Sequence, residues 1–218
     1  MTSLSQTARQ YLDQAKDALG ASFGDLRQRL DQLDELDANL NSTAERIRGD
    51  ERLAPEAKRD DLKAATSVYR DATKKLTTEA HQLVEEREKV LRAHLQPPGL
   101  DGPDAQGRLG NARADALLVL DRTTDDDLGT ALETLARDPG DVGHLLLSGW
   151  AERYLQARQS NAAAAIWNSQ RDAIAADRLG PDAQAARQHL EGLKPARAVP
   201  TLMDHHAHNT AASVEGAG

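Results

Sequence analysis

The sequence predicts an all-α protein. Its apolar residues include 30 leucines and abundant alanine, but only seven valines and three isoleucines, and aromatic residues make up 3% of the chain. Leucine and alanine favour helices, whereas β-branched and aromatic residues are typical of strands. Two series of apolar residues with a seven-residue period further predict a long antiparallel helical hairpin that resembles a coiled coil. A small helical bundle is expected to follow it.

The first series places an apolar residue at every seventh position: Leu12, Leu19, Leu26, Leu33, Leu40 and Ile47. A seven-residue period sustained in this way indicates a helix that packs lengthwise on another helix. Lys16 and Asp37 occupy positions of the same seam where apolar residues are expected. Gly20 and Gly24 fall within the helix, but the series keeps its phase across them. We therefore expect a continuous or gently bent helix.

The second series consists of Leu62, Tyr69, Leu76, Leu83 and Val90. Between the two series, Gly49 is typical of a helix end and Pro55 of the first turn of a new helix. A connection this short predicts that the two helices pack antiparallel. If Ile47 is paired with Leu62, and the other members of the two series are paired in order from there, the chain reverses direction at this break. The hairpin is therefore expected over residues 1–95.

The rest of the chain has a different pattern. A stretch rich in proline and glycine, residues 96–110, predicts a linker. Shorter helical patterns then predict a small all-helical domain over residues 111–194, with Trp150 and Trp167 as packing residues. Residues 195–218 show no usable periodicity, so we expect a flexible tail.

Part of the predicted helical domain loosely resembles a tetratricopeptide helix pair. The resemblance is carried by a break at Asp138–Pro139, by Gly149 and Tyr154 in the first helix, and by Ala163 and Trp167 in the second. Gly149 and Tyr154 do not both fit the repeat in one register, and no second copy of the repeat follows. The resemblance implies a helical groove that binds a peptide, as in an adaptor or a chaperone.

Charge and hydropathy favour protein partners. The formal net charge is −8, and residues 1–98 carry 16 Lys and Arg against 18 Asp and Glu. Neither half has the basic excess that binding to a phosphate backbone requires. No apolar run approaches the ~18 residues of a membrane span, and the N-terminus lacks a signal-peptide pattern. We therefore expect no nucleic acid, membrane or small-molecule substrate, and a location in the cytoplasm or in a particle assembled there.

Two segments concentrate polar side chains that could serve a site. The segment DHHAH, residues 204–208, combines three imidazoles with a carboxylate, but it lies in the predicted tail, without the rigid support that metal sites use. We expect no metal there. The aspartates of TTDDDLG follow Thr124, which is expected to cap a helix, where negative charge complements the helix dipole. The chain has no cysteine, and no nucleophile and base can be paired from spacing, so no catalytic residue and no cofactor are expected.

The expected function is therefore structural. A long hairpin used as a helical spacer or clamp suits a homo-oligomer or a component of a larger complex, such as a virion, a scaffold or a secretion apparatus. The alternative is an adaptor or chaperone that binds peptides through the tetratricopeptide-like helices. Neither is an enzyme.

Overall fold

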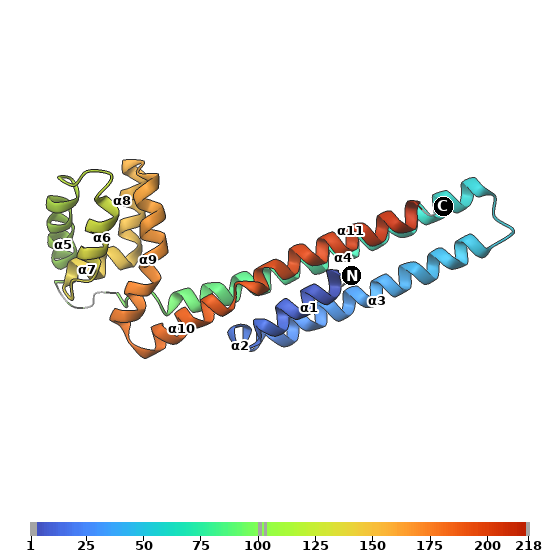
Figure 1. Cartoon of the computed structure of the whole chain (residues 1–218), viewed down its shortest axis with the longest axis horizontal. Coiled ribbons are helices and arrows are strands. Elements are labelled where there is room, and N and C mark those ends of the chain that lie inside the picture. The colour runs from blue at the N-terminus through green and yellow to red at the C-terminus, as the bar shows by residue number, and fades with distance from the viewer. Residues whose placement is uncertain (1–3, 100–101, 103, 217–218) are drawn as a thin grey trace. The chain divides into compact units, whose positions relative to one another are not determined.

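The computed structural model describes residues 4–99, 102 and 104–216, and every regular element among them is helical (Figure 1). The prediction of an all-α protein is confirmed. The chain divides into two compact units. The terminal unit combines residues 1–89 with residues 189–218, and the central unit consists of residues 90–188. Among the described residues, none of the helices combines the length and apolar character that crossing a lipid bilayer requires.

Helices from both ends of the sequence form the terminal unit. They are α1 (Leu4–Gln14), α2 (Lys16–Leu19), α3 (Ser22–Gly49), α4 (Pro55–Ala93), a 3-10 turn (Pro195–Ala198) and α11 (Val199–Gly216). The break between α3 and α4 falls at Gly49 and Pro55, where the sequence predicts it. Helix α4 has 39 residues, which corresponds to about 58 Å at the usual rise per residue.

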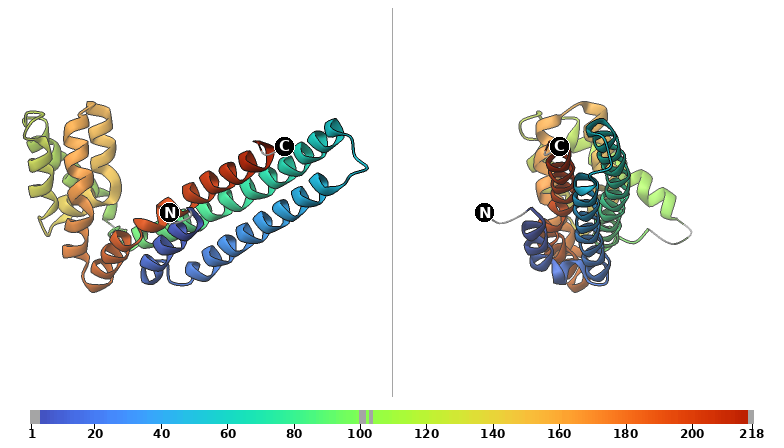
Figure 2. Two further views of the ribbon diagram at one scale, coloured as in Figure 1. Left: turned by 45° about the vertical axis from the view of Figure 1, so that its right-hand side comes forward. Right: turned by 90° about the vertical axis from the view of Figure 1, so that its right-hand side faces the viewer.

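Helices α3 and α4 run antiparallel and side by side (Figures 1 and 2). Near the connection, Lys58 Nζ donates a hydrogen bond to the carbonyl oxygen of Arg48 at 2.8 Å. Farther along the pair, Arg29 Nε lies 2.9 Å from Glu79 Oε2. Residue numbers therefore fall along α3 as they rise along α4.

The first predicted helix is not continuous. The chain reverses at Gly20, whose φ of 56° is unfavourable for other residues. Helix α1 then lies along α3: Ser5 Oγ donates to Asp34 Oδ1 at 2.9 Å, and Arg9 Nη2 lies 2.8 Å from Asp31 Oδ1. The prediction of a continuous or gently bent helix is wrong. An apolar series keeps its phase when the helix folds back onto the same core, so the period alone does not distinguish the two arrangements.

The buried face of α4 follows an eleven-residue period. Leu62, Thr73 and Val84 are buried and lie eleven residues apart. The predicted series instead passes from buried through half-buried to exposed, in the order Leu62, Tyr69, Leu76, Leu83 and Val90. A straight helix drifts about 20° per heptad relative to a seven-residue repeat. Val90, 51% exposed, thus lies outside the packed face, contrary to the prediction.

The first apolar series stays in the core. Its buried members are Leu12, Leu19, Leu26, Leu33 and Leu40, and Ile47 at the end of α3 is half-buried. Helix α3 keeps a seven-residue buried pattern because α1 and α11 pack on it in addition to α4. Contacts on several sides make a wider band of the helix surface part of the core.

The C-terminal residues form a helix, so the prediction of a flexible tail over 195–218 is wrong. Helix α11 packs on α1 and α3, and it lies alongside α4 in Figure 1 and in the left view of Figure 2. Its buried residues include Val199, Met203, Ala207, Ala211 and Val214. Two of these five are alanines, so the helical spacing is present without the large apolar side chains that make a period recognisable.

The central unit is a bundle of shorter helices. They are α5 (Ala105–Leu120), α6 (Leu128–Ala136), α7 (Asp141–Leu145), α8 (Ala151–Arg158), α9 (Asn161–Leu179) and most of α10 (Pro181–Gly192). Helix α5 begins inside the predicted linker, residues 96–110, and the unit ends within α10, before the predicted limit of the domain 111–194. Both predicted limits are therefore displaced. Residues 146–150 join α7 to α8 through a kink at Gly149, whose φ of 88° is not helical.

Candidate functional site

A polar cluster joins three helices of the terminal unit. Tyr69 of α4 donates a hydrogen bond to Asp37 Oδ1 of α3 at 2.5 Å, and His206 Nε2 of α11 lies 2.5 Å from Asp37 Oδ2. The side chains of Asp37 and His206 are 16% and 20% exposed. A carboxylate in a helical seam is costly unless its oxygens are bonded. Here each oxygen has a partner, which accounts for an aspartate at a position where an apolar residue is expected.

The cluster also sets the charge of its members. Burial, and secondly the bond to Asp37, raises the pKa of Tyr69, so its hydroxyl stays protonated and donates. The bond to Asp37 raises the pKa of His206 against the lowering effect of burial. A protonated His206 supplies the positive charge that stabilises the carboxylate. The cluster is thus an electrostatic connection between α11 and the α3–α4 pair.

A second set of contacts holds the end of α11. Thr66 Oγ1 donates to Glu215 Oε1 at 2.7 Å, and Arg70 Nη2 donates to Glu215 Oε2 at 2.8 Å. Arg48 Nη2 donates to the carbonyl oxygen of Val214 at 2.6 Å. The last carbonyl groups of a helix lack partners within the helix, so Arg48 satisfies one of them.

Another surface of the α3–α4 pair holds an apolar groove of about 270 Å³, lined by Leu36, Asn39, Leu40, Thr43, Ala65, Val68, Tyr69 and Ala72. We call it the α3–α4 groove. None of these lining side chains is charged. Val68 is 71% exposed beside it. We take this apolar depression, with Val68 exposed at its rim, as the candidate interaction surface of the terminal unit.

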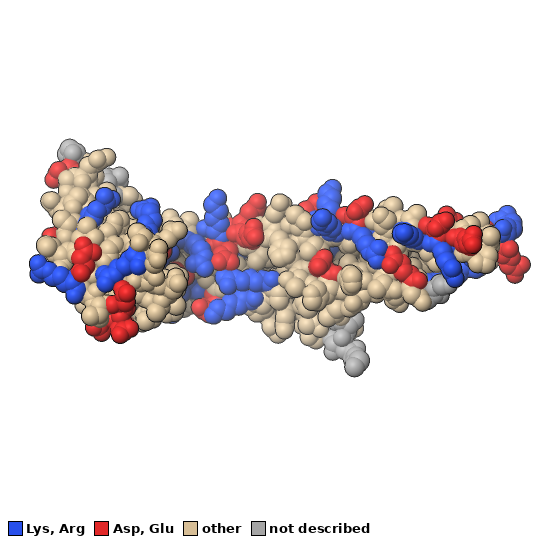
Figure 3. All heavy atoms as spheres, turned by 90° about the horizontal axis from the view of Figure 1, so that it is seen from above, with Lys and Arg blue, Asp and Glu red and all other residues tan. Residues whose placement is uncertain are grey.

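The groove continues into a more polar cavity of about 450 Å³, which shares Leu36, Asn39 and Ala72 with it and whose further lining includes Arg29, Glu35, Lys75 and Glu79. The charges in this continuation balance. On the face of the molecule shown in Figure 3, acidic and basic side chains are likewise mixed. The α3–α4 groove and its continuation therefore combine an apolar area with charges of both signs, a combination that suits contact with another protein.

The DHHAH segment does not act as one cluster. His206 contacts Asp37, whereas its neighbours lie on another face of α11, because successive residues of a helix differ by about 100°. A polar cavity of about 680 Å³ is lined by Arg70, Thr73, Lys74, Asp204, His205, Ala207, His208 and Asn209. Within residues 4–99, 102 and 104–216, no group of three or more histidine, aspartate or glutamate side chains is placed to hold a metal ion.

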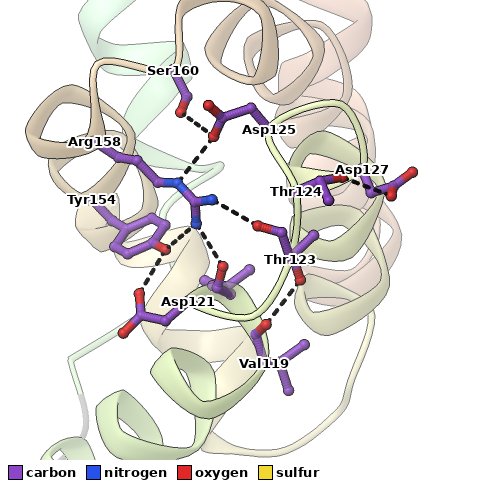
Figure 4. Close-up of polar contacts among 10 residues, drawn as sticks. Val119, Asp121, Thr123, Thr124, Asp125, Asp127, Tyr154, Arg158 and Ser160 are labelled. Atoms are coloured by element: carbon purple, nitrogen blue, oxygen red, sulfur yellow. Dashed lines mark hydrogen bonds and ion pairs between the residues drawn. The ribbon is translucent and has the colours of Figure 1, made fainter.

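In the central unit, Arg158 of α8 organises the loop between α5 and α6 (Figure 4). Its guanidinium donates to the carbonyl oxygens of Leu120 at 2.6 Å and Thr123 at 2.7 Å, and to the hydroxyl of Tyr154 at 2.9 Å. Its Nε donates to Asp125 Oδ1 at 3.0 Å. Leu120 is the last residue of α5, so Arg158 also satisfies a carbonyl at a helix end.

The threonines and aspartates of the segment TTDDDLG form this loop and not the first turn of a helix. Thr124 Oγ1 donates to Asp127 Oδ2 at 2.9 Å, and α6 begins only at Leu128. The predicted capping role of Thr124 is wrong. Asp125 accepts hydrogen bonds from Arg158 and from Ser160 Oγ, the latter at 3.0 Å, so its carboxylate connects the loop to α8 and to the start of α9.

Both tryptophans belong to the core of the central unit. Trp167 is fully buried, and its Nε1 donates to Glu152 Oε1 at 3.1 Å. Trp150 is buried and stacks on Tyr154, with ring centroids 5.3 Å apart. Their fluorescence therefore reports on the folding of the central unit.

The position of Val68 at the α3–α4 groove and the contact between His206 and Asp37 are the features of the site that the sequence does not reveal. Val68 belongs to neither apolar series, although Ala65, three residues before it, and Ala72, four residues after it, lie on the same face of the helix. For His206 the available signal is Asp37, since a charged residue in a helical seam predicts a polar partner without indicating which one.

Comparison with known proteins adds no relative: no protein-family model, no curated protein and no solved structure matches the chain. The α3–α4 groove and the two polar clusters are therefore the features that bear on function.

Proposed function

We propose that this chain is a non-enzymatic structural or assembly protein, whose terminal unit is a helical spacer or clamp in a larger protein complex such as a virion, a scaffold or a secretion apparatus. The long α3–α4 hairpin supplies length, and the small bundle of the central unit supplies a second body that docks elsewhere. The complex assembles in the cytoplasm. The observation that carries the proposal is the α3–α4 groove, where Val68 exposes an apolar side chain beside an apolar depression.

The construction of the terminal unit supports a spacer. Helix α4 is uninterrupted over 39 residues, and α3 packs along it in the opposite direction. Helix α11 is bonded to this pair at two levels, through Asp37 and through Glu215. Bending such a unit would strain contacts between three helices at once, so it holds its length better than a single helix would.

The polar clusters support a structural role as well. A catalytic acid or base has to lie within hydrogen-bond reach of its substrate. The two oxygens of Asp37 are instead bonded to Tyr69 and His206, and the guanidinium of Arg158 is bonded to two backbone carbonyls. These groups stabilise the contacts between helices.

Sedimentation of the tagged full-length chain in extracts of the cells that produce it tests the proposal. We expect the chain to co-sediment with a complex far larger than its own 23.6 kDa, and Val68→Asp to shift it to the light fractions. Val119→Asp is the matched control, since Val119 is an exposed valine of the central unit. A wild-type chain that sediments by itself in such extracts contradicts the assembly role.

A further inference from the structure

We infer that the α3–α4 groove binds helix α4 of a second copy of this chain, antiparallel and centred on Val68. The inference rests on the proposed assembly function and deepens it, because it names the partner and the register of the contact. Three observations carry it: the spacing of the residues on the exposed face of α4, the symmetry of their charges, and the shape of the surface around Val68.

Ala65, Val68 and Ala72 form a short apolar stripe on the exposed face of α4. Steps of four and three residues extend this stripe to Asp61 on one side and Lys75 on the other, and all five side chains are exposed or half-buried. Side chains spaced in this way lie on one side of a helix, so a second helix can contact all of them.

The charges on this face are symmetric about Val68. Asp61 lies seven residues before Val68 and Lys75 lies seven residues after it, and both side chains are exposed. A twofold axis through Val68 places Asp61 of each copy opposite Lys75 of the other, and this symmetry forms the pair twice. A parallel arrangement would place Asp61 opposite Asp61 and Lys75 opposite Lys75. The charge pattern therefore favours an antiparallel second copy over a parallel one.

The side chains around Val68 suit a close approach. Ala65 and Ala72 flank Val68 on the same face, and in the antiparallel register Ala65 of one copy lies within one residue, about 1.5 Å along the axis, of the level of Ala72 of the other. Because alanine is small, the two helix axes approach to about 8 Å, the short end of the usual range. The two valines then meet at the rims of the two grooves, whose α3 walls include Leu36 and Leu40.

Helix α11 leaves this face accessible. Thr66 and Arg70, which hold Glu215 of α11, lie on one side of α4. Val68 is two residues from each of them, about 160–200° away around the helix. A second copy can therefore approach Val68 without displacing α11.

Sedimentation equilibrium of the purified full-length chain tests the inference. We expect a reversible dimer for the wild type and a monomer for Val68→Asp, with Val119→Asp unaffected. Circular dichroism that matches the wild type shows that each variant is folded. A wild-type chain that stays monomeric over the accessible concentration range overturns the inference.

Charge exchange tests the register. Asp61→Lys and Lys75→Asp each place like charges opposite one another twice, and we expect each to weaken the dimer about tenfold or more. The double variant D61K/K75D restores opposite charges across the axis and is expected to recover the dimer. Failure of the double variant to improve on the single variants overturns the antiparallel register.

A cysteine on the axis gives an independent test. The chain has no cysteine, so Val68→Cys introduces one thiol that faces its symmetry mate, and mild oxidation is expected to link two chains. Val119→Cys is the matched control and is expected to stay unlinked. Equal linking of the two variants contradicts the inference.

These results are separable from those for the proposed function. If the purified chain is monomeric but co-sediments with a large complex in extracts, and Val68→Asp abolishes that co-sedimentation, the groove binds another protein. The inference then fails and the assembly role stands. A chain that dimerises through Val68 but sediments in extracts as a free dimer supports the inference and contradicts the assembly role.

Discussion

The polar cluster of the terminal unit and that of the central unit differ in the sequence distance they span. Asp37 contacts His206, 169 residues away, whereas Arg158 bonds groups at most 38 residues away. Both clusters satisfy polar groups between helices. Only the first connects the two ends of the sequence. The terminal unit therefore depends on long-range contacts that the central unit does not need.

The two units also differ in how a histidine is tuned. In the terminal unit, the bond to Asp37 raises the pKa of His206. In the central unit, burial and then the charge of Arg178 lower the pKa of His144. The same side chain is thus favoured in its charged form in one unit and in its neutral form in the other. The bond to Asp37 decides the direction of the pKa shift for His206, and burial decides it for His144.

Removing Asp37 should have the largest effect and should be confined to the terminal unit. Asp37→Ala leaves His206 and the hydroxyl of Tyr69 without their acceptor, and we expect a loss of about 3 kcal/mol in the free energy of unfolding. Circular dichroism in urea reports both units, whereas fluorescence follows the central unit alone, because both tryptophans lie there.

We expect the circular dichroism of Asp37→Ala to show an earlier transition and the fluorescence transition to stay in place. Asp37→Asn is the control, since an amide keeps one acceptor oxygen and should lose less. A fluorescence transition that shifts together with the circular dichroism would show that the two units unfold as one.

The reversal at Gly20 allows a matched pair of substitutions within the terminal unit. Gly20→Ala forces a side chain into a positive-φ conformation and should cost about 2 kcal/mol. Gly24→Ala lies inside α3, where a Cβ meets nothing within 4 Å, and should stabilise the unit by up to about 1 kcal/mol. Urea unfolding followed by circular dichroism measures both, and shifts of the same sign would contradict the reversal.

Arg158 provides the corresponding test in the central unit, with a smaller expected effect. Arg158→Met removes the donors to Leu120 and Thr123 on a partly exposed surface, and we expect a loss of about 1 kcal/mol, visible as an earlier fluorescence transition. Arg158→Lys keeps the charge but not the fork of donors, so its loss should be intermediate. If Arg158→Lys is as stable as the wild type, the charge of Arg158 alone, and not its fork of donors, stabilises the loop.

The two histidines predict small pH dependences of opposite sign. The folded-state pKa of His206 is raised above the ordinary 6.5, so its contribution is complete below that value and is lost as pH rises through the raised pKa. The pKa of His144 is lowered, so its contribution is complete above 6.5 and is lost as pH falls through the lowered pKa.

Urea titrations between mildly acidic and mildly alkaline pH measure these dependences. The urea midpoint of the circular dichroism transition should fall on the alkaline side, and that of the fluorescence transition should fall on the acidic side. His206→Gln should abolish the first dependence and leave the second. Transitions of the two units that move in parallel with pH would contradict the assignment.

Much of the fold could be predicted because it depends on local signals. The excess of leucine and alanine over β-branched residues predicts helices, and Gly49 and Pro55 mark the break between α3 and α4. The apolar series does not indicate the reversal at Gly20, because folding back preserves its phase. It does not indicate the drift of α4 either, because a seven-residue series departs only gradually from the face that a straight helix buries.

The candidate site could be predicted only in part. Asp37 is recognisable as a polar residue in an apolar seam, but its partner His206 belongs to a helix whose buried face is largely alanine. Val68 becomes informative only when the structure shows that its face of α4 is left uncovered. Spacing identifies a face of a helix, and only packing shows what that face meets.

The participation of α11 in the terminal unit has a consequence for the order of folding during synthesis. Residues 90–188 are contiguous, so the central unit can assemble as soon as they leave the ribosome. The α3–α4 pair is made earlier but must wait for α11 to cover its flank, and its leucines stay open to water and to other nascent chains in that interval. Shortening the chain at residue 198 removes α11 and should therefore make it aggregate during translation.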